Sequence, residues 1–148
     1  MKLIGIDYGR RRIGCAITDD SGMHVRGLPT IDRKKYPQTL LPILEIVARE
    51  LPHAIVVGLP LGGDDEETLM SAEVRAFAEG LRKKTALPLY YIDESMSSRE
   101  AASLLRFRKK KDRRNKEAVD RIAACIILEN FLRETSPETL SLPAGEGE

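Results

Sequence analysis

Residues 3–18 read LIGIDYGRRRIGCAIT, which is two short apolar runs separated by a basic turn. The first run ends at Asp7 and the second begins at Ile13. Isoleucine-rich runs of this length, bounded by glycine-containing turns, are typical of strands, so the stretch predicts two strands joined by a tight turn. Residues 25–31 predict a third strand of the same meander, in which Pro29 requires a position at a sheet edge or at the strand end.

Beyond this meander, the spacing of the apolar residues alternates between helical and extended. Helical spacing predicts helices over residues 39–51, 69–81 and roughly 117–133, and a capping box predicts a further helix beginning at Ser97. Continuous apolar runs predict strands over residues 54–59 and 87–92. Three early strands followed by alternating helices and strands predict an α/β fold, in which a mixed β-sheet has helices on both faces.

The composition restricts the class of protein. A chain of 148 residues with 42% hydrophobic and 32% charged residues is typical of one globular domain. The net charge of +1 excludes a uniformly basic coat, so any affinity for nucleic acid must come from local clustering. The two cysteines lie in apolar runs and indicate free thiols in the core, and the two isolated histidines exclude a zinc constellation. We expect the domain to cover residues 1–135 and residues 136–148 to form a disordered tail.

Neither a targeting segment nor a membrane segment is expected. Asp7 interrupts the apolar start before the core of a signal peptide could form. The longest apolar runs are far too short to span a bilayer. We therefore expect a cytoplasmic protein.

Three carboxylates are candidates for chemistry, namely those of Asp7, Glu94 and Asp120. Asp7 and Glu94 follow predicted strands, and strand ends are where open α/β folds place ligands. Asp120 shares a helix face with Ala124 and Ile127, so its charge needs an arginine or a bound cation as partner. Three acids without a usable histidine favour Mg²⁺ or Mn²⁺, and two such ions about 4 Å apart can promote phosphodiester hydrolysis. For each acid taken singly, a solvated surface position is the alternative interpretation.

Two basic segments are candidates for contact with phosphate. The first follows Asp7 directly and consists of Arg10, Arg11 and Arg12. The second spans residues 106–114, of which seven are cationic: Arg106, Arg108, Lys109, Lys110, Lys111, Arg113 and Arg114. A solvated charge run is the alternative interpretation, but the position between Glu94 and Asp120 favours a phosphate-binding arm.

Several segments together resemble the motifs of the YqgF family. They are Gly5-Ile6-Asp7-Tyr8-Gly9, Arg12-Ile13-Gly14-Cys15-Ala16 with Asp19, Val56-Val57-Gly58-Leu59-Pro60-Leu61, Phe77-Ala78 with Leu81, Asp93-Glu94-Ser95 with Ser97 and Ala101, and Asp120 with Ala123, Ala124, Ile127 and Leu128. The similarity spans residues 1 to about 133 in the order found in the family. One departure is Ser95, which stands where the family usually has arginine.

This resemblance implies a ribonuclease H-like fold, in agreement with the mixed sheet. Members are described as Holliday-junction-resolvase-like proteins or as nucleases that mature the 5′ end of 16S ribosomal RNA. The implied metal-binding and catalytic acids are Asp7, Glu94 and Asp120, with Mg²⁺ or Mn²⁺ as cofactor. The implied activity is hydrolysis of phosphodiester bonds in structured nucleic acid, with precursor 16S ribosomal RNA as the favoured substrate. The expected partners are nucleic acid and the ribosome, with no membrane, and the expected assembly is a monomer or homodimer.

Three other functions are compatible with parts of the pattern. A Holliday junction resolvase acting on branched DNA would use the same chemistry. A non-catalytic module that binds RNA or the ribosome is disfavoured, because all three acids are retained. An ATPase is suggested by the Asp-x-Gly opening, which also resembles the phosphate loop of actin-like kinases. Those proteins need two such subdomains and an adenosine motif, for which 148 residues are too few.

Overall fold

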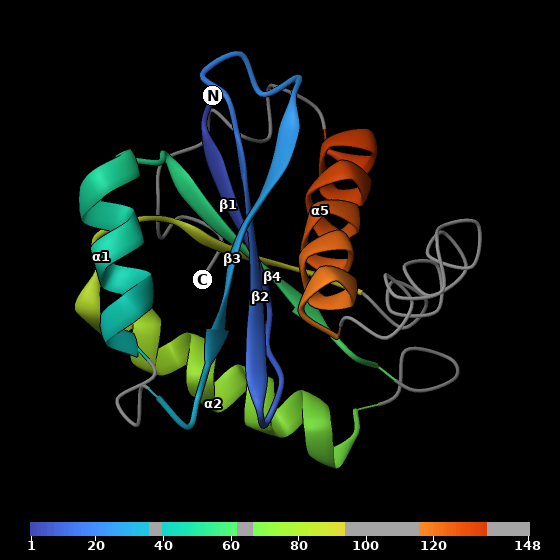
Figure 1. Cartoon of the computed structure of the whole chain (residues 1–148). Coiled ribbons are helices and arrows are strands. Elements are labelled where there is room, and N and C mark those ends of the chain that lie inside the picture. The colour runs from blue at the N-terminus through green and yellow to red at the C-terminus, as the bar shows by residue number, and fades with distance from the viewer. Residues whose placement is uncertain (36–39, 62–66, 94–115, 136–148) are drawn as a thin grey trace.

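The computed structural model describes residues 1–35, 40–61, 67–93 and 116–135 (Figure 1). The strands of this part are β1 (Leu3–Asp7), β2 (Arg12–Thr18), β3 (Val25–Asp32), β4 (Ala54–Leu59) and β5 (Leu89–Asp93). Its helices are α1 (Leu40–Glu50), α2 (Leu69–Lys84) and α5 (Lys116–Glu134). Each of these elements confirms a predicted one to within a few residues. The helix predicted from Ser97, the basic stretch 106–114 and the tail 136–148 lie outside the described residues.

The five strands form one mixed sheet in the order β3-β2-β1-β4-β5. β2 is antiparallel to both β1 and β3, whereas β4 is parallel to β1 and β5 is parallel to β4. Pro29 therefore lies in an edge strand, as predicted. The carboxyl ends of β1, β4 and β5 meet at one edge of the sheet, which is where ligands bind in open α/β folds.

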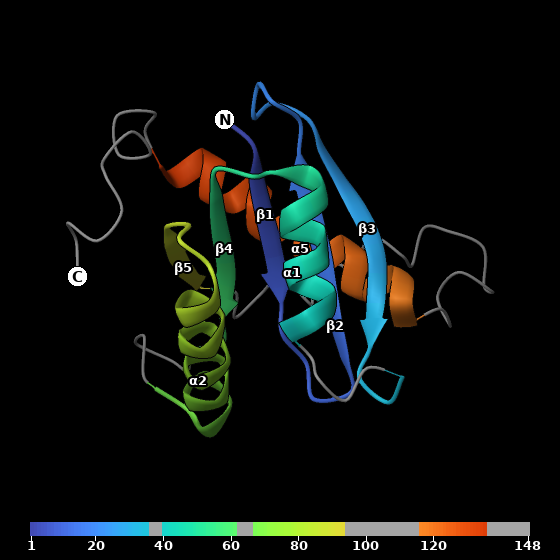
Figure 2. The same cartoon turned by 90° about the vertical axis from the view of Figure 1, so that its left-hand side faces the viewer.

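Helices cover both faces of the sheet, which confirms the predicted arrangement. Figure 2 shows α1 and α2 on one side and α5 crossing the other side. Alternation along β1 divides its residues between these layers. Ile4 and Ile6 belong to the core that also contains residues of α1 and α2, and Leu3 belongs to the core shared with α5. Within the described residues, no helix is long and apolar enough to cross a membrane.

Helix α5 lies unusually close to the sheet because glycines face it. A Cβ atom added to Gly5 would lie 2.5 Å from Cγ of Leu128, and one added to Gly14 would lie 2.2 Å from the backbone oxygen of Asp120. Gly27 of the edge strand faces the same helix. Ala124 of α5 is fully buried against the sheet, and its small side chain also allows close approach. Because glycine has no side chain at these positions, α5 and its residue Asp120 can lie close to β1 and β2.

Gly80 of α2 has a different environment, and we expect Gly80→Ala to stabilise the protein. A Cβ atom there would meet only Cδ1 of Leu40, at 3.6 Å, which is ordinary van der Waals contact. Within a helix, alanine is favoured over glycine by about 0.8–1 kcal/mol. Urea denaturation should therefore show a gain of about 0.5–1 kcal/mol in the free energy of unfolding. A loss would show that α1 and α2 are packed more tightly than the contact indicates.

Glu50, at the end of α1, joins that helix to the sheet. Its carboxylate contacts Lys2 Nζ at 3.2 Å, Arg49 Nε at 3.1 Å and Arg26 Nη2 at 3.5 Å. Hydrogen bonds from Arg49 and Lys2, with the charges of Lys2 and Arg26, lower the pKa of Glu50 from its ordinary value of 4.5. A lowered pKa in the folded state stabilises the protein above pH 4.5, and this stabilisation is lost as the pH falls through the folded-state pKa.

We therefore expect Glu50→Gln to be less stable than the wild type at neutral pH. The difference should shrink when both proteins are denatured with urea at a pH below 4. Glu45→Gln is the matched control, because Glu45 is exposed on the same helix. A difference that stays constant across this range would mean that Glu50 stabilises the fold by packing and not by charge.

Candidate active site

Asp7 and Asp120 come from distant parts of the chain and lie at the same edge of the sheet. Asp7 is the last residue of β1, is half-buried, and is the Cα partner of Gly14 in β2. Such partners are about 5 Å apart. Gly14 in turn lies directly beneath Asp120, since a Cβ atom added to it would be 3.2 Å from Cβ of Asp120. Leu3 and Gly5 face α5, so alternation places Asp7 on that same face.

Arg12 holds the carboxylate of Asp120. Its Nε donates a hydrogen bond of 2.8 Å to Oδ2, and the two side chains are only 28% and 21% exposed. Arginine was one of the two partners expected for a carboxylate on this helix face, and the structure identifies which arginine it is. Removal of Arg12 would leave a largely buried charge uncompensated, so we assign it a positioning role toward Asp120.

The predicted basic element 10–12 is divided among three different environments. Arg10 points to the opposite side of the sheet, where its Nε donates a hydrogen bond of 2.8 Å to Oε2 of Glu73 in α2. This contact lowers the pKa of Glu73. Arg11 is exposed, and no carboxylate of the described residues pairs with it. Of the three arginines, Arg11 is therefore the one without a carboxylate partner among the described residues.

A feature that sequence analysis missed holds the segment after Asp7. Nη1 of Arg33 donates hydrogen bonds of 3.0 Å to both the hydroxyl of Tyr8 and the backbone oxygen of Gly9. The same guanidinium lies 5.0 Å from the centre of the Tyr8 ring, which packs against Phe77 at 4.8 Å between centroids. The position of Arg33 in the sequence could have identified it, because it directly follows β3, a strand that runs in the same direction as β1.

The cysteines take no part in this site. Burial, followed by the charge of Asp7, raises the pKa of the Cys15 thiol to about 12. Burial also raises the pKa of Cys125 to about 11. Both thiols are therefore protonated and weak nucleophiles at neutral pH. This confirms the expectation that they are free thiols and that at least Cys15 is part of the core.

The remaining candidate residues are not described. Glu94 directly follows β5, and both it and the basic stretch 106–114 lie outside the described residues. Among the residues that are described, no group of three metal-ligating side chains is present. Asp7 and Asp120 provide carboxylate oxygens, which are the ligands that Mg²⁺ and Mn²⁺ prefer, so the residues present fit such an ion.

Comparisons with known proteins extend this description. The family model RuvX, described as Holliday junction resolvase, matches residues 1–134. A protein of Oleidesulfovibrio alaskensis with the name "Putative pre-16S rRNA nuclease" is 41% identical over 143 residues, which covers 97% of this chain and 98% of the relative. A protein of the same name from Nitratidesulfovibrio vulgaris is 43% identical over 132 residues, which covers 89% of this chain and 93% of the relative.

Solved structures agree on the fold. RuvC of Thermus thermophilus, in complex with a Holliday junction substrate, has a TM-score of 0.57 and 17% identity, and the match covers 90% of this chain and 96% of RuvC. The fowlpox virus Holliday junction resolvase has a TM-score of 0.53 and 11% identity, with 90% and 99% covered. These similarities confirm the predicted ribonuclease H-like fold. The family model and the two relatives show that the chain belongs to the RuvX family, also called YqgF, and is a phosphodiester-hydrolysing enzyme of the nuclease class.

Proposed function

We propose that this protein is a metal-dependent nuclease that matures the 5′ end of precursor 16S ribosomal RNA in the cytoplasm. The observation that carries the proposal is the convergence of Asp7 and Asp120 across Gly14, with Arg12 holding Asp120. Relatives about 40% identical over most of the chain, whose name states this substrate, support the choice of RNA. A substrate of this kind would bring the enzyme into contact with the ribosome.

Asp7, Asp120 and Glu94 are the acids that we assign to the reaction. Asp7 ends the central strand, and the following residues are fixed by Arg33. Glu94 is the residue directly after β5, a strand that ends at the same edge as β1. We assign Mg²⁺ or Mn²⁺ as the ion held by these carboxylates. When bound, such an ion stabilises charge on the phosphodiester oxygens and promotes attack by water.

Other side chains of this protein have roles in positioning and in substrate binding. Asp120 is oriented by Arg12, so that its carboxylate does not have to be ordered when substrate arrives. Arg12 also offsets the repulsion between Asp120 and Asp7. Arg11 and the basic stretch 106–114 are assigned to the phosphate backbone of the substrate. Arg12, which pairs with Asp120, is assigned to holding the site together, whereas Arg10 pairs with Glu73 of α2 on the other side of the sheet.

The substrate is tested by incubating the purified protein, in parallel, with a precursor 16S ribosomal RNA fragment and with a four-way DNA junction, each with Mn²⁺ or Mg²⁺. We expect cleavage of the RNA at the 5′ side of the mature sequence and no cleavage of the junction. Cleavage of the junction alone would favour the resolvase. Binding of the RNA without cleavage of either substrate would favour a non-catalytic module, and both outcomes would overturn the proposal.

A further inference from the structure

The loop after β3 carries basic residues that lie beside the active-site edge. Arg33, Lys34 and Lys35 follow the end of β3 at Asp32. We propose that Arg11, Lys34 and Lys35, here called the β3-loop patch, bind the phosphate backbone of the nucleic-acid substrate next to the cleaved bond. The inference rests on the proposed function, because it assigns a further part of the same substrate to a surface outside the site.

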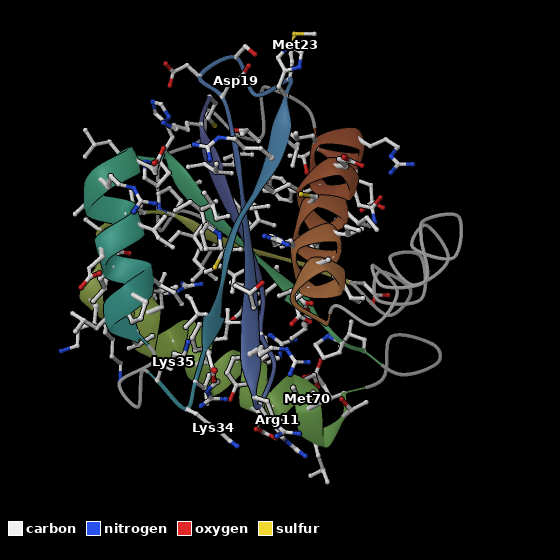
Figure 3. All side chains as sticks on the ribbon, viewed as in Figure 1. Arg11, Asp19, Met23, Lys34, Lys35 and Met70 are labelled. Carbon is white, nitrogen blue, oxygen red and sulfur yellow. The ribbon has the colours of Figure 1, made fainter. Side chains whose placement is uncertain are left out.

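Backbone contacts bring the members of the patch together. β1 and β3 run in the same direction, since each is antiparallel to β2, so β3 ends at the edge that holds Asp7. Arg12 and Asp32 are Cα partners, and the amide of Arg33 donates a hydrogen bond of 3.0 Å to the backbone oxygen of Arg11. Figure 3 shows Arg11, Lys34 and Lys35 on neighbouring loops at the same end of the molecule.

The patch has an excess of positive charge. The side chains of Arg11, Lys34 and Lys35 are exposed, and no carboxylate of the described residues forms an ion pair with them. The carboxylates of Asp32 and Glu73, which neighbour the patch, each have a hydrogen-bond partner. Asp32 accepts a hydrogen bond of 2.9 Å from the backbone amide of Lys34, and Glu73 pairs with Arg10. The negative charge of phosphate groups would neutralise such a surface.

Hydrogen bonds hold the backbone of the patch in place relative to Asp7. The amide of Lys35 donates a hydrogen bond of 3.0 Å to the backbone oxygen of Asp32, which closes the turn. Arg33, inside this turn, is bound to Tyr8 and to Gly9, which are the two residues after Asp7. One set of contacts therefore fixes the patch and the strand end with the catalytic acid, so phosphates bound at the patch would be held in register with the site.

The proposal is tested with the triple variant Arg11→Ala/Lys34→Ala/Lys35→Ala, by measuring its affinity for a short RNA duplex at several salt concentrations in EDTA. Each lost phosphate contact makes the slope of log affinity on log salt shallower by about 0.7–0.9. We expect the slope to become shallower by about 2–3 and the binding to weaken. The matched control is Lys83→Ala/Lys84→Ala/Arg133→Ala, which removes the same residue types from exposed positions near the carboxyl ends of α2 and α5, outside the patch.

The control variant should keep the slope of the wild type. An unchanged slope in the patch variant, or an equal change in both variants, would overturn the proposal. Because EDTA prevents metal-dependent cleavage, these outcomes are distinct from failure of the proposed nuclease function.

Discussion

Replacing either Asp7 or Asp120 with asparagine is expected to reduce cleavage by about 100- to 1,000-fold or more, the loss typical for removal of one preorganised electrostatic group. Asparagine keeps the size of aspartate but removes its charge, so the fold should persist while the site loses affinity for a divalent ion. Initial cleavage rates at saturating Mn²⁺ measure the effect, and thermal unfolding checks that each variant is folded.

Asp19→Asn is the matched control for these two variants. Asp19 lies in the turn between β2 and β3, at the opposite end of the molecule, where its Oδ1 accepts a hydrogen bond of 2.6 Å from Ser21 (Figure 3). The same chemical change there should leave the cleavage rate unaltered. If Asp120→Asn cleaved as fast as the wild type, its place beside Gly14 would be purely structural, and the assignment of the site would be wrong.

A second large effect is expected from Gly14→Ala. The added methyl group would lie 2.2 Å from the backbone oxygen of Asp120, and a backbone atom cannot rotate away as a side chain can. Helix α5 must therefore shift, which should lower the free energy of unfolding by about 1–3 kcal/mol. Because the shift occurs at Asp120 itself, we also expect the cleavage rate of the folded protein to fall by about 100-fold.

Urea denaturation and cleavage assays on the same preparation separate these two effects. Gly80→Ala makes the same chemical change in α2, where space is available, and should be stabilised and fully active. Gly14→Ala with the stability and the activity of the wild type would contradict the close approach of α5 to β2.

Much of the architecture was predictable, because local patterns determine it. The isoleucine-rich runs of β1 and β2, the continuous run of β4 and the helical spacing of α5 each depend on a single short segment. The position of Pro29 in an edge strand also followed from one residue. For the same reason, the apolar neighbours of Asp120 indicated that its carboxylate faces the sheet and requires a partner.

The partners themselves were not predictable from local patterns. Arg10, Arg11 and Arg12 form one basic run in sequence, but Arg10 pairs with Glu73, 63 positions away, and Arg12 pairs with Asp120, 108 positions away. Which side of the sheet each arginine reaches depends on the alternation and twist of the assembled strands. Composition alone therefore could not separate the arginine that pairs with no carboxylate of the described residues from the two that do.

The role of Gly14 was hidden for a related reason. Within the sequence it is a glycine in a strand, and only the packed helix shows that no side chain fits there. Arg33 was overlooked because its partners, Tyr8 and Gly9, belong to a different strand end. Contacts between distant segments thus define the site, whereas local segments define the elements that carry it.

The central claim, that Asp7 and Asp120 serve one ion site, is tested most directly by calorimetric titration of Mn²⁺ into the wild type, Asp7→Asn, Asp120→Asn, the double variant and Glu73→Gln. We predict that each single variant weakens binding by more than the roughly 10- to 100-fold typical of a lost outer-shell partner, and that the double variant binds little worse than either. Glu73→Gln, which removes a carboxylate paired with Arg10, should bind as the wild type does. Unchanged affinity in either single variant, or strictly additive losses in the double variant, would contradict a shared site.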